Sequence, residues 1–302
     1  MDKSIQKDIL FSIIIPTYNR AELIGKTIES LQKQTYKGYE LIIVDDGSTD
    51  NTEQVVSFYL NNQTSYHKKN NAERAAARNY GASLAKGDYI NFFDSDDIAL
   101  PNHLSEAANL INSKVNPEWF HLSYSYADPD GLVSRNMTQN IGETLNSKIC
   151  NGNLLSCNGV FIRRDIILKN RFNEDRELSA SEDYELWCRL TARFPLYYSN
   201  SITSLIIEHD LRSVQQINNQ KLIVRLNLLT TYLKKDKIVL DYFGKRFKKI
   251  EMEVFSYAAL HLKQPDFKVK SIVYLFKTLS SYPLFIIKKR FYVILRNIIT
   301  IW

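Results

Sequence analysis

The residues best suited to chemistry in this 302-residue chain are the acids of Asp94-Ser95-Asp96-Asp97, which follow the apolar segment Tyr89–Phe93. Asp94 and Asp96 are two residues apart, and on an extended segment such side chains point the same way. Two carboxylates there suit Mg²⁺ or Mn²⁺, which combine one or two carboxylates with water and phosphate oxygens. The structural alternative is an acidic turn that caps the next helix.

A second pair of acids, Asp45 and Asp46, follows the apolar segment Leu41–Val44 and precedes Gly47-Ser48. A glycine at this point allows the backbone to turn sharply. A carboxylate accepts hydrogen bonds from N–H donors, so the pair has the chemistry to bind a ligand. An Asx-turn that starts a helix is the structural alternative.

A third acid, Asp183, follows Ser181 and Glu182 at the start of a segment with helical spacing, Asp183–Arg193. A positioned carboxylate can take the proton of an attacking hydroxyl group, which makes Asp183 a candidate general base. The alternative is that these acids stabilise the helix N-terminus, an effect of about 0.3–1 kcal/mol.

The elements that must position these acids alternate between strand and helix. Apolar, β-branched runs predict buried strands, and spacings of three and four predict helices between them. The expected strands are Phe11–Ile15, Leu41–Val44, Tyr89–Phe93, Trp119–Tyr126, Asn158–Arg163 and Ile202–Ile207, with a weak strand near Tyr66, and the clearest helices are Ala72–Ala85 and Asp183–Arg193. This alternation predicts the α/β class with a mostly parallel central sheet. In such sheets ligands bind at the carboxyl ends of the strands, where the first two acidic pairs are expected.

Five segments, in this order, resemble the motif set of the family 2 inverting glycosyltransferases, which have the GT-A fold. They are SIIIPTYNR (Ser12–Arg20), VDDGSTD (Val44–Asp50), ARNYG (Ala77–Gly81), FFDSDD (Phe92–Asp97) and SEDYELWCRL (Ser181–Leu190). The resemblance covers about residues 10–213. It implies a sugar transferase that uses a nucleotide-diphosphate donor, most simply a UDP-sugar, and Mn²⁺ or Mg²⁺.

The resemblance also implies roles for individual residues. Asp96 and the late histidine, His209, are expected at the metal, Asp183 as the base, and Glu182 in acceptor orientation or loop support. The expected nucleotide-sugar contacts are Pro16, Thr17, Tyr18, Asp45, Arg78, Asp94 and Ser95. Among them, Asp45 is expected at the nucleobase and Asp94 at the ribose. Asp46 and Asp97 are expected to be structural. One departure is Ile207, where the family usually has an arginine, and Arg212 is a candidate substitute.

The charge of the chain is uneven. The net charge is +6, but residues 214–302 hold 17 Lys and Arg against 5 Asp and Glu, whereas residues 1–213 hold 22 against 28. The basic residues lie among apolar ones at helical spacing, with no recognisable nucleic-acid module. The segment Ser281–Trp302 is typical of an amphipathic helix at a membrane surface, and packing on the catalytic domain is the alternative.

We therefore expect a GT-A catalytic domain over residues 1–213, with a nucleotide-binding half at about 10–115 and an acceptor half at about 116–213. Residues 214–302 are expected to form a basic helical C-terminal region. No segment has the roughly 20 apolar residues that span a bilayer. An odd, sparse set of three cysteines argues against a secreted disulfide framework. A cytoplasmic protein, peripheral at the inner face of the cell membrane, is the expected location.

The function predicted from the sequence is sugar transfer with inversion to an acceptor hydroxyl, on a saccharide or a lipid-linked saccharide. The expected setting is bacterial O-antigen, capsule or exopolysaccharide synthesis. One alternative is a sugar nucleotidyltransferase of related fold, although Pro16-Thr17-Tyr18-Asn19 is not the Gly-rich loop that holds a triphosphate. The other is a non-catalytic membrane partner that retains the fold.

Overall fold

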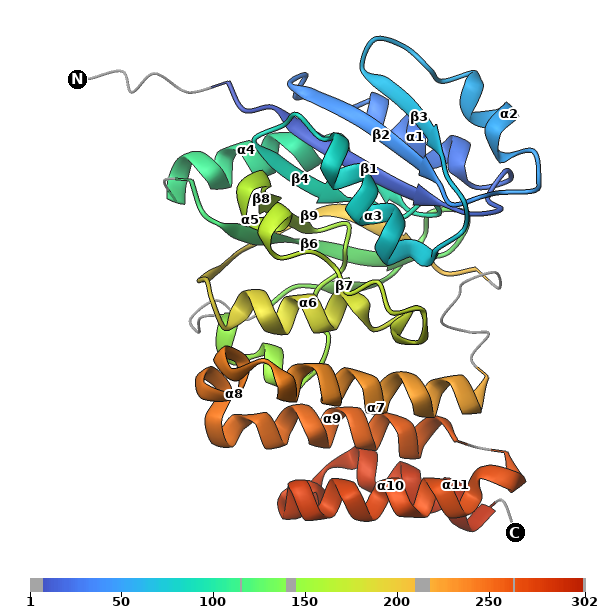
Figure 1. Ribbon diagram of the computed structural model, residues 1–302, viewed down its shortest axis with the longest axis vertical. Coiled ribbons are helices and arrows are strands. Elements are labelled where there is room, and N and C mark those ends of the chain that lie inside the picture. Colours follow the sequence, from blue (N-terminus) through green and yellow to red (C-terminus); the bar gives the residue numbers. More distant parts are fainter. Residues whose placement is uncertain (1–7, 115, 140–144, 210–217, 263, 301–302) are drawn as a thin grey trace. The chain divides into compact units, whose positions relative to one another are not determined.

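The computed structural model describes residues 8–114, 116–139, 145–209, 218–262 and 264–300 (Figure 1). The chain packs as two compact units. The first comprises Met1–Leu145, Leu155–Glu174 and Phe194–Arg212, and the second comprises Asn146–Leu154, Asp175–Arg193 and Ser213–Trp302. The units interleave along the chain, so the segment with Asp183 packs with the C-terminal helices. The division of the chain into a catalytic domain and a C-terminal region at residue 213 stays a prediction.

The first unit is built on one curled sheet. Over the described residues its strand order is β3-β2-β1-β4-β8-β6-β9-β5, with β7 paired to β6. Strands β1, β2, β3, β4, β6 and β9 run in one direction, and β5, β7 and β8 run in the other. The strands are β1 (Phe11–Thr17), β2 (Tyr39–Asp45), β3 (Thr64–Lys68), β4 (Tyr89–Phe92), β5 (Ile98–Ala99), β6 (Trp119–Ala127), β7 (Val133–Met137), β8 (Val160–Arg163) and β9 (Leu196–Ile207). The predicted α/β fold is confirmed, and most of the described strands run in one direction, although the sheet is mixed because β5, β7 and β8 pair antiparallel with their neighbours.

Helices cover both faces of this sheet, which explains why its central strands are apolar on both sides. Ile13 and Ile15 of β1 belong to a cluster with Ile28 of α1 and Leu104 of α4. On the other face, Ile14 packs against α3, where a Cβ at Gly81 would lie 2.4 Å from the Ile14 side chain. The helices of this unit are α1 (Ile24–Gln32), α2 (Thr52–Ser57), α3 (Glu73–Leu84), α4 (His103–Lys114) and α5 (Arg164–Lys169).

Two predicted strands differ from the observed ones at their starts. Strand β8 begins at Val160, so Asn158 lies in the preceding turn rather than in the strand. Strand β9 begins at Leu196, six residues before the predicted Ile202. The polar residues Ser199, Asn200 and Ser201 concealed its first half, which pairs in parallel with β6.

The second unit is helical. Its helices are α6 (Glu182–Thr191), α7 (Asn219–Lys235), α8 (Lys237–Phe243), α9 (Phe247–His261), α10 (Lys268–Ser281) and α11 (Lys289–Thr300). Asn218 caps α7 by accepting the Gln220 and Lys221 N–H groups, and Asp236 caps α8 by accepting those of Ile238 and Val239. The core includes Leu229 of α7, Ile250 of α9 and Ile294 of α11. The predicted basic helical C-terminal region is confirmed.

The predicted continuous helix over Ser281–Trp302 is wrong. Helix α10 ends at Ser281, a 3₁₀ turn spans Pro283–Ile287, and α11 begins only at Lys289. Pro283 carries no backbone N–H and cannot continue a helix. Trp302 lies outside the described residues.

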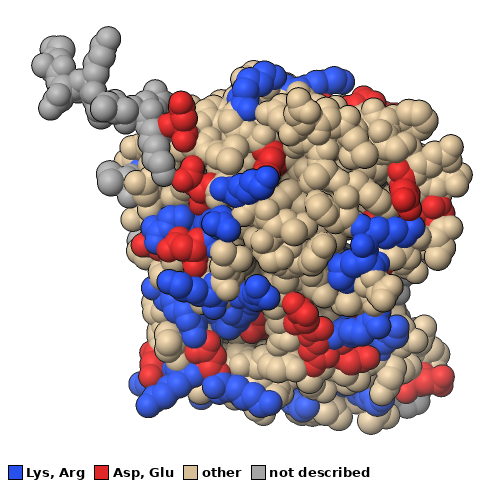
Figure 2. Space-filling model, turned by 45° about the horizontal axis from the view of Figure 1, so that its top comes forward, with Lys and Arg blue, Asp and Glu red and all other residues tan. Residues whose placement is uncertain are grey.

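Charges of both signs are interspersed on the face that Figure 2 draws, where Lys and Arg lie beside Asp and Glu. Within the second unit, Lys234 pairs with Glu251 at 2.6 Å and Arg290 with Glu253 at 2.5 Å. Over the described part of the chain, no helix is both long and hydrophobic enough to cross a membrane. Cys150, Cys157 and Cys188 are buried and are not joined in disulfides.

Candidate functional site

The carboxyl ends of β1, β2, β4 and β9 lie at one edge of the sheet because these strands run in the same direction. The loops after them carry most of the predicted donor and metal residues. Short strand β5 follows Asp97 directly and pairs with the end of β9, Ile98 opposite Leu205. This pairing brings the loop after β4 to the residues that follow β9, although β4 and β9 are not neighbours in the sheet.

Asp96 and His209 meet at this edge. His209 Nε2 lies 3.2 Å from Asp96 Oδ2, and Arg20 Nε lies 3.8 Å from the same oxygen. The structure therefore brings together the two residues predicted to bind metal, which are 113 positions apart. Arg20 is a cation that the sequence analysis did not single out, although it ends the first quoted motif.

The donor set of this pair fits a divalent ion of the Mg²⁺ or Mn²⁺ type. The side chains of Asp96 and His209 are 18% and 11% exposed, so both remain partly open to solvent. His209 Nδ1 is buried without a hydrogen-bond partner among the described residues. No group of three or more His, Cys, Asp and Glu side chains suited to a metal was found in the described residues. A two-residue set agrees with ions that keep several water or phosphate ligands.

Asp94 forms an ion pair with the buried side chain of Arg78. Arg78 Nη2 donates to Asp94 Oδ1 at 2.9 Å, and the Arg78 side chain is only 2% exposed. Its guanidinium also lies 5.3 Å from the Phe172 ring centre. Asp94 keeps 35% of its side chain exposed, so it presents a carboxylate whose position is fixed by a buried cation.

Asp45 and Asp46 are buried, with 0% and 3% exposure. Asp45 Oδ1 accepts the Ser48 N–H at 2.7 Å, which is the Asx-turn arrangement, and Asp45 Oδ2 accepts the Tyr66 hydroxyl at 2.6 Å. Burial, together with this bond, raises the pKa of Tyr66, so the phenol remains a donor. Asp46 accepts from Lys69 Nζ at 2.5 Å and from the Ala72 N–H at 3.0 Å. The structural role expected for Asp46 agrees with these bonds.

The remaining predicted donor residues differ in exposure. Pro16 and Thr17 lie inside β1 and are buried, and Ser95 is 6% exposed. Tyr18 is 47% exposed, so its ring is the most accessible of this group. Thr17 Oγ1 is a buried atom with no hydrogen-bond partner among the described residues.

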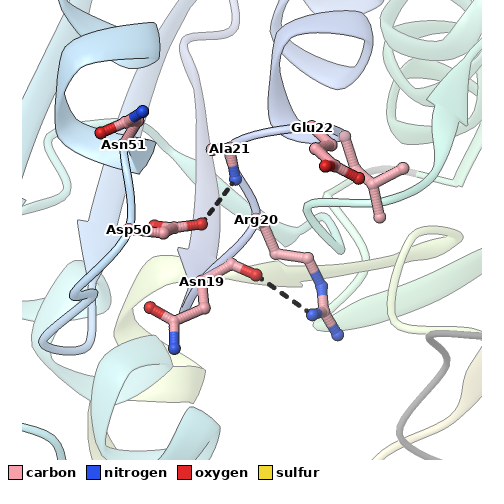
Figure 3. Close-up of a pocket in the computed structure, with 7 residues that line it drawn as sticks. Asn19, Arg20, Ala21, Glu22, Asp50 and Asn51 are labelled. Carbon is pink, nitrogen blue, oxygen red and sulfur yellow. Dashed lines mark hydrogen bonds between the residues drawn. The ribbon is translucent and has the colours of Figure 1, made fainter.

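A pocket of about 380 Å³ opens beside these loops (Figure 3). It is lined by Asn19, Arg20, Ala21, Glu22, Leu23, Asp50 and Asn51. Figure 3 shows the Ala21 N–H donating to Asp50 and the Arg20 guanidinium donating to the Asn19 carbonyl. Arg20 lines the pocket and also lies near Asp96. The pocket was not predicted from the sequence.

Asp183 lies in the second unit, in the first turn of α6. Asn153 Nδ2 donates to Asp183 Oδ2 at 2.8 Å, and the Tyr184 N–H donates to Oδ1 at 2.6 Å. Arg225 of α7 is 8% exposed; burial lowers its pKa, while Tyr257, Glu182 and Asp183 act in the opposite direction. The predicted base thus sits near a buried cation from the C-terminal helices. Arg212, the predicted substitute for the missing arginine, lies outside the described residues.

Known proteins resemble this chain in sequence. The profile described as Glycosyl transferase family 2 matches residues 12–153. The chain is 33% identical over 189 residues to UDP-Glc:alpha-D-GlcNAc-diphosphoundecaprenol beta-1,3-glucosyltransferase WfaP of Escherichia coli, covering 61% of this chain and 71% of WfaP. It is 29% identical over 219 residues to an uncharacterized glycosyltransferase of Rickettsia felis, covering 70% of this chain but only 36% of that protein.

Solved structures share the fold. TarS 1-349 of S. aureus in complex with UDP superimposes with a TM-score of 0.68 at 17% identity, covering 97% of this chain and 89% of TarS 1-349. Mannosyltransferase PcManGT from Pyrobaculum calidifontis, in complex with GDP-Man and Mn²⁺, gives 0.58 at 15% identity, covering 97% and 86%. The fold is therefore GT-A. Together with this fold, the profile match and the similarity to WfaP show that the chain is a glycosyltransferase and belongs to glycosyltransferase family 2.

Proposed function

We propose that this chain transfers a sugar from a UDP-sugar to an acceptor hydroxyl, with inversion, during bacterial cell-surface polysaccharide synthesis. The observation that carries the proposal is the meeting of Asp96 and His209 at 3.2 Å, at the edge of the sheet where nucleotides bind in open α/β folds. Two comparisons support the donor class, since WfaP is named for UDP-Glc and TarS was solved with UDP.

Asp96 and His209 are the residues that would hold Mn²⁺ or Mg²⁺. When bound, such an ion supplies positive charge that stabilises a diphosphate leaving group. Asp94, fixed by Arg78, would accept a hydrogen bond from the donor, and Ser95 lies between the two acids. Exposed Tyr18 would pack against the nucleotide beside Pro16 and Thr17.

Asp45 is the proposed partner of the nucleobase, and its surroundings set a condition on that role. Both carboxylate oxygens already accept a hydrogen bond, but each oxygen has a second lone pair. A base N–H would therefore share Asp45 with Ser48 and Tyr66 rather than replace them. Because Asp45 is fully buried, a small movement of the loop after β2 would have to accompany binding.

The donor proposal is tested by a thermal shift of the full chain with UDP, GDP and Mn²⁺. A ligand that binds the folded state at 100 times its Kd stabilises it by about 2.7 kcal/mol, which is readily measured. We expect UDP to raise Tm in the presence of Mn²⁺ and much less after chelation, with a smaller effect of GDP. An equal shift with and without Mn²⁺ would contradict the metal assignment, and a larger shift with GDP would contradict the donor.

Asp183 is the proposed general base. In a displacement with inversion the acceptor hydroxyl loses its proton as the new bond forms, and the Asp183 carboxylate would take it. Asn153 and the Tyr184 N–H each hold one oxygen, which fixes the direction of the carboxylate. Buried Glu182, its neighbour, would support the loop or orient the acceptor.

Asp183→Asn keeps the size of the side chain but removes its basicity. We expect turnover to fall by about 10²–10⁴-fold while UDP affinity stays within error. Asp165→Asn, which alters an exposed carboxylate paired with Arg163, is the matched control and should leave both unchanged. Near-normal turnover of Asp183→Asn would remove Asp183 as the base.

The proposed location is the cytoplasm, at the inner face of the cell membrane, with a saccharide or a lipid-linked saccharide as acceptor. WfaP is named for a diphosphoundecaprenol-linked acceptor. In this chain the 3₁₀ turn Pro283–Ile287 exposes Leu284 (60%) and Ile287 (70%), directly before Lys288 and Lys289. Exposed apolar side chains next to lysines suit the boundary of an anionic lipid surface.

Flotation of the full chain with phosphatidylglycerol vesicles and with neutral vesicles tests this location. We expect binding to the anionic vesicles and its loss in Leu284→Ser/Ile287→Ser. Phe58→Ser, at a 79% exposed apolar residue of the first unit, is the matched control. Equal flotation of the double variant and the control would rule out docking through this turn.

A further inference from the structure

A buried amide, Asn158, lies against the acidic loop after β4. Asn158 Nδ2 donates to Asp97 Oδ2 at 2.7 Å, and Asn158 Oδ1 accepts the Asp94 N–H at 2.8 Å. Asn158 is 0% exposed and Asp97 is 1% exposed. One side chain thus contacts both ends of the Asp94–Asp97 loop, in an environment where an unmade hydrogen bond is costly.

Asp97 extends this contact to the end of β9. Its second oxygen, Oδ1, accepts the Ile207 N–H at 2.9 Å, two residues before His209. The Asp97 carbonyl also accepts the Thr27 hydroxyl of α1 at 2.8 Å. Asp97 therefore connects the loop that carries Asp96 to the segment that carries His209.

A further set of buried bonds fixes Asn158 from the core side. Asn91 Nδ2 of β4 donates to the Asn158 carbonyl at 2.8 Å. Asn91 Oδ1 lies 3.4 Å from His103 Nε2, and His103 Nδ1 lies 2.9 Å from the Thr203 hydroxyl of β9. Burial lowers the pKa of His103 to about 3, so the imidazole is neutral. The turn with Asn158 is thereby tied to the strands on either side of the site.

We infer that Asp97 and Asn158 are positioning residues for the Asp96–His209 pair. Neither is expected to touch the ion or the donor. Their bonds hold the two segments in the register that brings Asp96 Oδ2 to 3.2 Å from His209 Nε2. The inference rests on the proposed function for its link to the metal, but the geometry it describes exists without the ion.

The hydrogen-bond directions of this pair allow a specific exchange. Asp97 only accepts, whereas Asn158 donates to Asp97 and accepts from Asp94. In Asn158→Asp two carboxylates face each other with no donor between them. In Asp97→Asn the new amide nitrogen faces either the Asn158 amide nitrogen or the Ile207 N–H, so two donors meet in either orientation. In the double variant Asp97→Asn/Asn158→Asp the three bonds named above can form again, because the amide introduced at position 97 can accept from the Ile207 N–H and donate to the carboxylate introduced at position 158, which in turn accepts the Asp94 N–H.

The experiment measures UDP affinity with and without Mn²⁺ for the full chain, the two single variants and the double variant, well below their melting temperatures. We expect each single variant to lose about 10–100-fold of the Mn²⁺-dependent affinity, the usual effect of removing a residue that orients a metal ligand. The double variant should regain affinity to within a few-fold. Glu174→Gln, at an exposed partner of Asn79 in another amide–carboxylate pair, is the control and should behave as the unchanged chain.

A second readout needs no metal. Hydrogen exchange of the backbone amides over residues 203–207 in the metal-free protein should quicken in both single variants and slow again in the double variant. Folded single variants with unchanged Mn²⁺ dependence and unchanged exchange would overturn the inference, and so would a double variant as impaired as the single ones. If UDP binding ignores Mn²⁺ in the unchanged chain, the proposed function fails, and the exchange pattern alone decides the positioning role.

Discussion

The acids after β2 and those after β4 look alike in sequence but have different surroundings. Asp45 and Asp46 are 0% and 3% exposed, and both are held by hydrogen bonds from within the unit. Asp94 and Asp96 keep 35% and 18% of their side chains exposed. Each pair directly follows an apolar strand, so the strand-end pattern alone does not separate a structural carboxylate from one that is free to bind a ligand.

The difference comes from the partners that other segments supply. Tyr66 of β3 and Lys69 just after it bond to Asp45 and Asp46, because β3 lies beside β2. In the loop after β4, Asp96 instead contacts His209, which follows β9. The buried acid of this loop, Asp97, accepts a hydrogen bond from Asn158. Burial therefore agrees with a structural role for Asp46, whereas Asp94 and Asp96 remain accessible to the donor and ion that we propose there.

Among the acids of these two loops, the largest effect is expected at Asp96. Asp96→Asn should lower turnover by at least about 100-fold, because the carboxylate proposed to hold the ion is lost while the site keeps its shape. Unfolding free energy should change by less than about 0.5 kcal/mol, since the side chain is partly exposed. Kinetics and urea unfolding of the same preparation measure both. Substantial destabilisation with near-normal turnover would reverse the comparison.

A moderate effect of the opposite kind is expected at Asp46. Asp46→Asn leaves Lys69 without its 2.5 Å carboxylate partner in a site that is 20% exposed at the lysine. We expect a loss of about 1–3 kcal/mol of unfolding free energy, because charge-assisted hydrogen bonds to a buried carboxylate become weaker bonds to a neutral amide, while Lys69 keeps its bond to the Asn70 carbonyl. Mn²⁺-dependent UDP binding of the folded variant should remain. Loss of that binding at unchanged stability would make Asp46 a site residue.

The smallest effect is expected at Tyr66. Tyr66→Phe removes one hydrogen bond to Asp45 Oδ2 and keeps the ring, so the expected destabilisation is about 0.5–1.5 kcal/mol. If Asp45 also binds the nucleobase, the freed oxygen should leave UDP affinity equal or higher. A marked fall in UDP affinity would show that Tyr66 itself contacts the donor. Urea unfolding and UDP titration separate these results.

Much of the fold was predictable because local patterns determine it. Apolar runs such as Phe11–Ile15 and Leu41–Val44 are stable as strands only where both faces of the sheet are buried. Helices packed on the two faces bury them. The start of β9 was missed because Ser199, Asn200 and Ser201 break the apolar pattern where pairing with β6 decides the conformation. The break at Pro283 was missed because the basic and apolar spacing continues across it.

The candidate site was predictable only in part. The motif resemblance pointed to Asp96 and His209, and the structure brings them together. It did not point to Arg20, Asn158 or Tyr66, whose contacts with Asp96, Asp97 and Asp45 depend on chain segments 21 to 76 residues apart. Such contacts follow from strand order and from the pairing of β5 with β9, and no local pattern encodes them.

In the proposed function, the loop after β4 holds a divalent ion together with the donor diphosphate. Crystals of the full chain grown with UDP and Mn²⁺ test it most directly, through the anomalous signal of manganese. We expect one peak within coordination distance of Asp96 and His209 and next to the UDP phosphates. A peak elsewhere with UDP bound, or bound UDP without any peak at this loop, would contradict it.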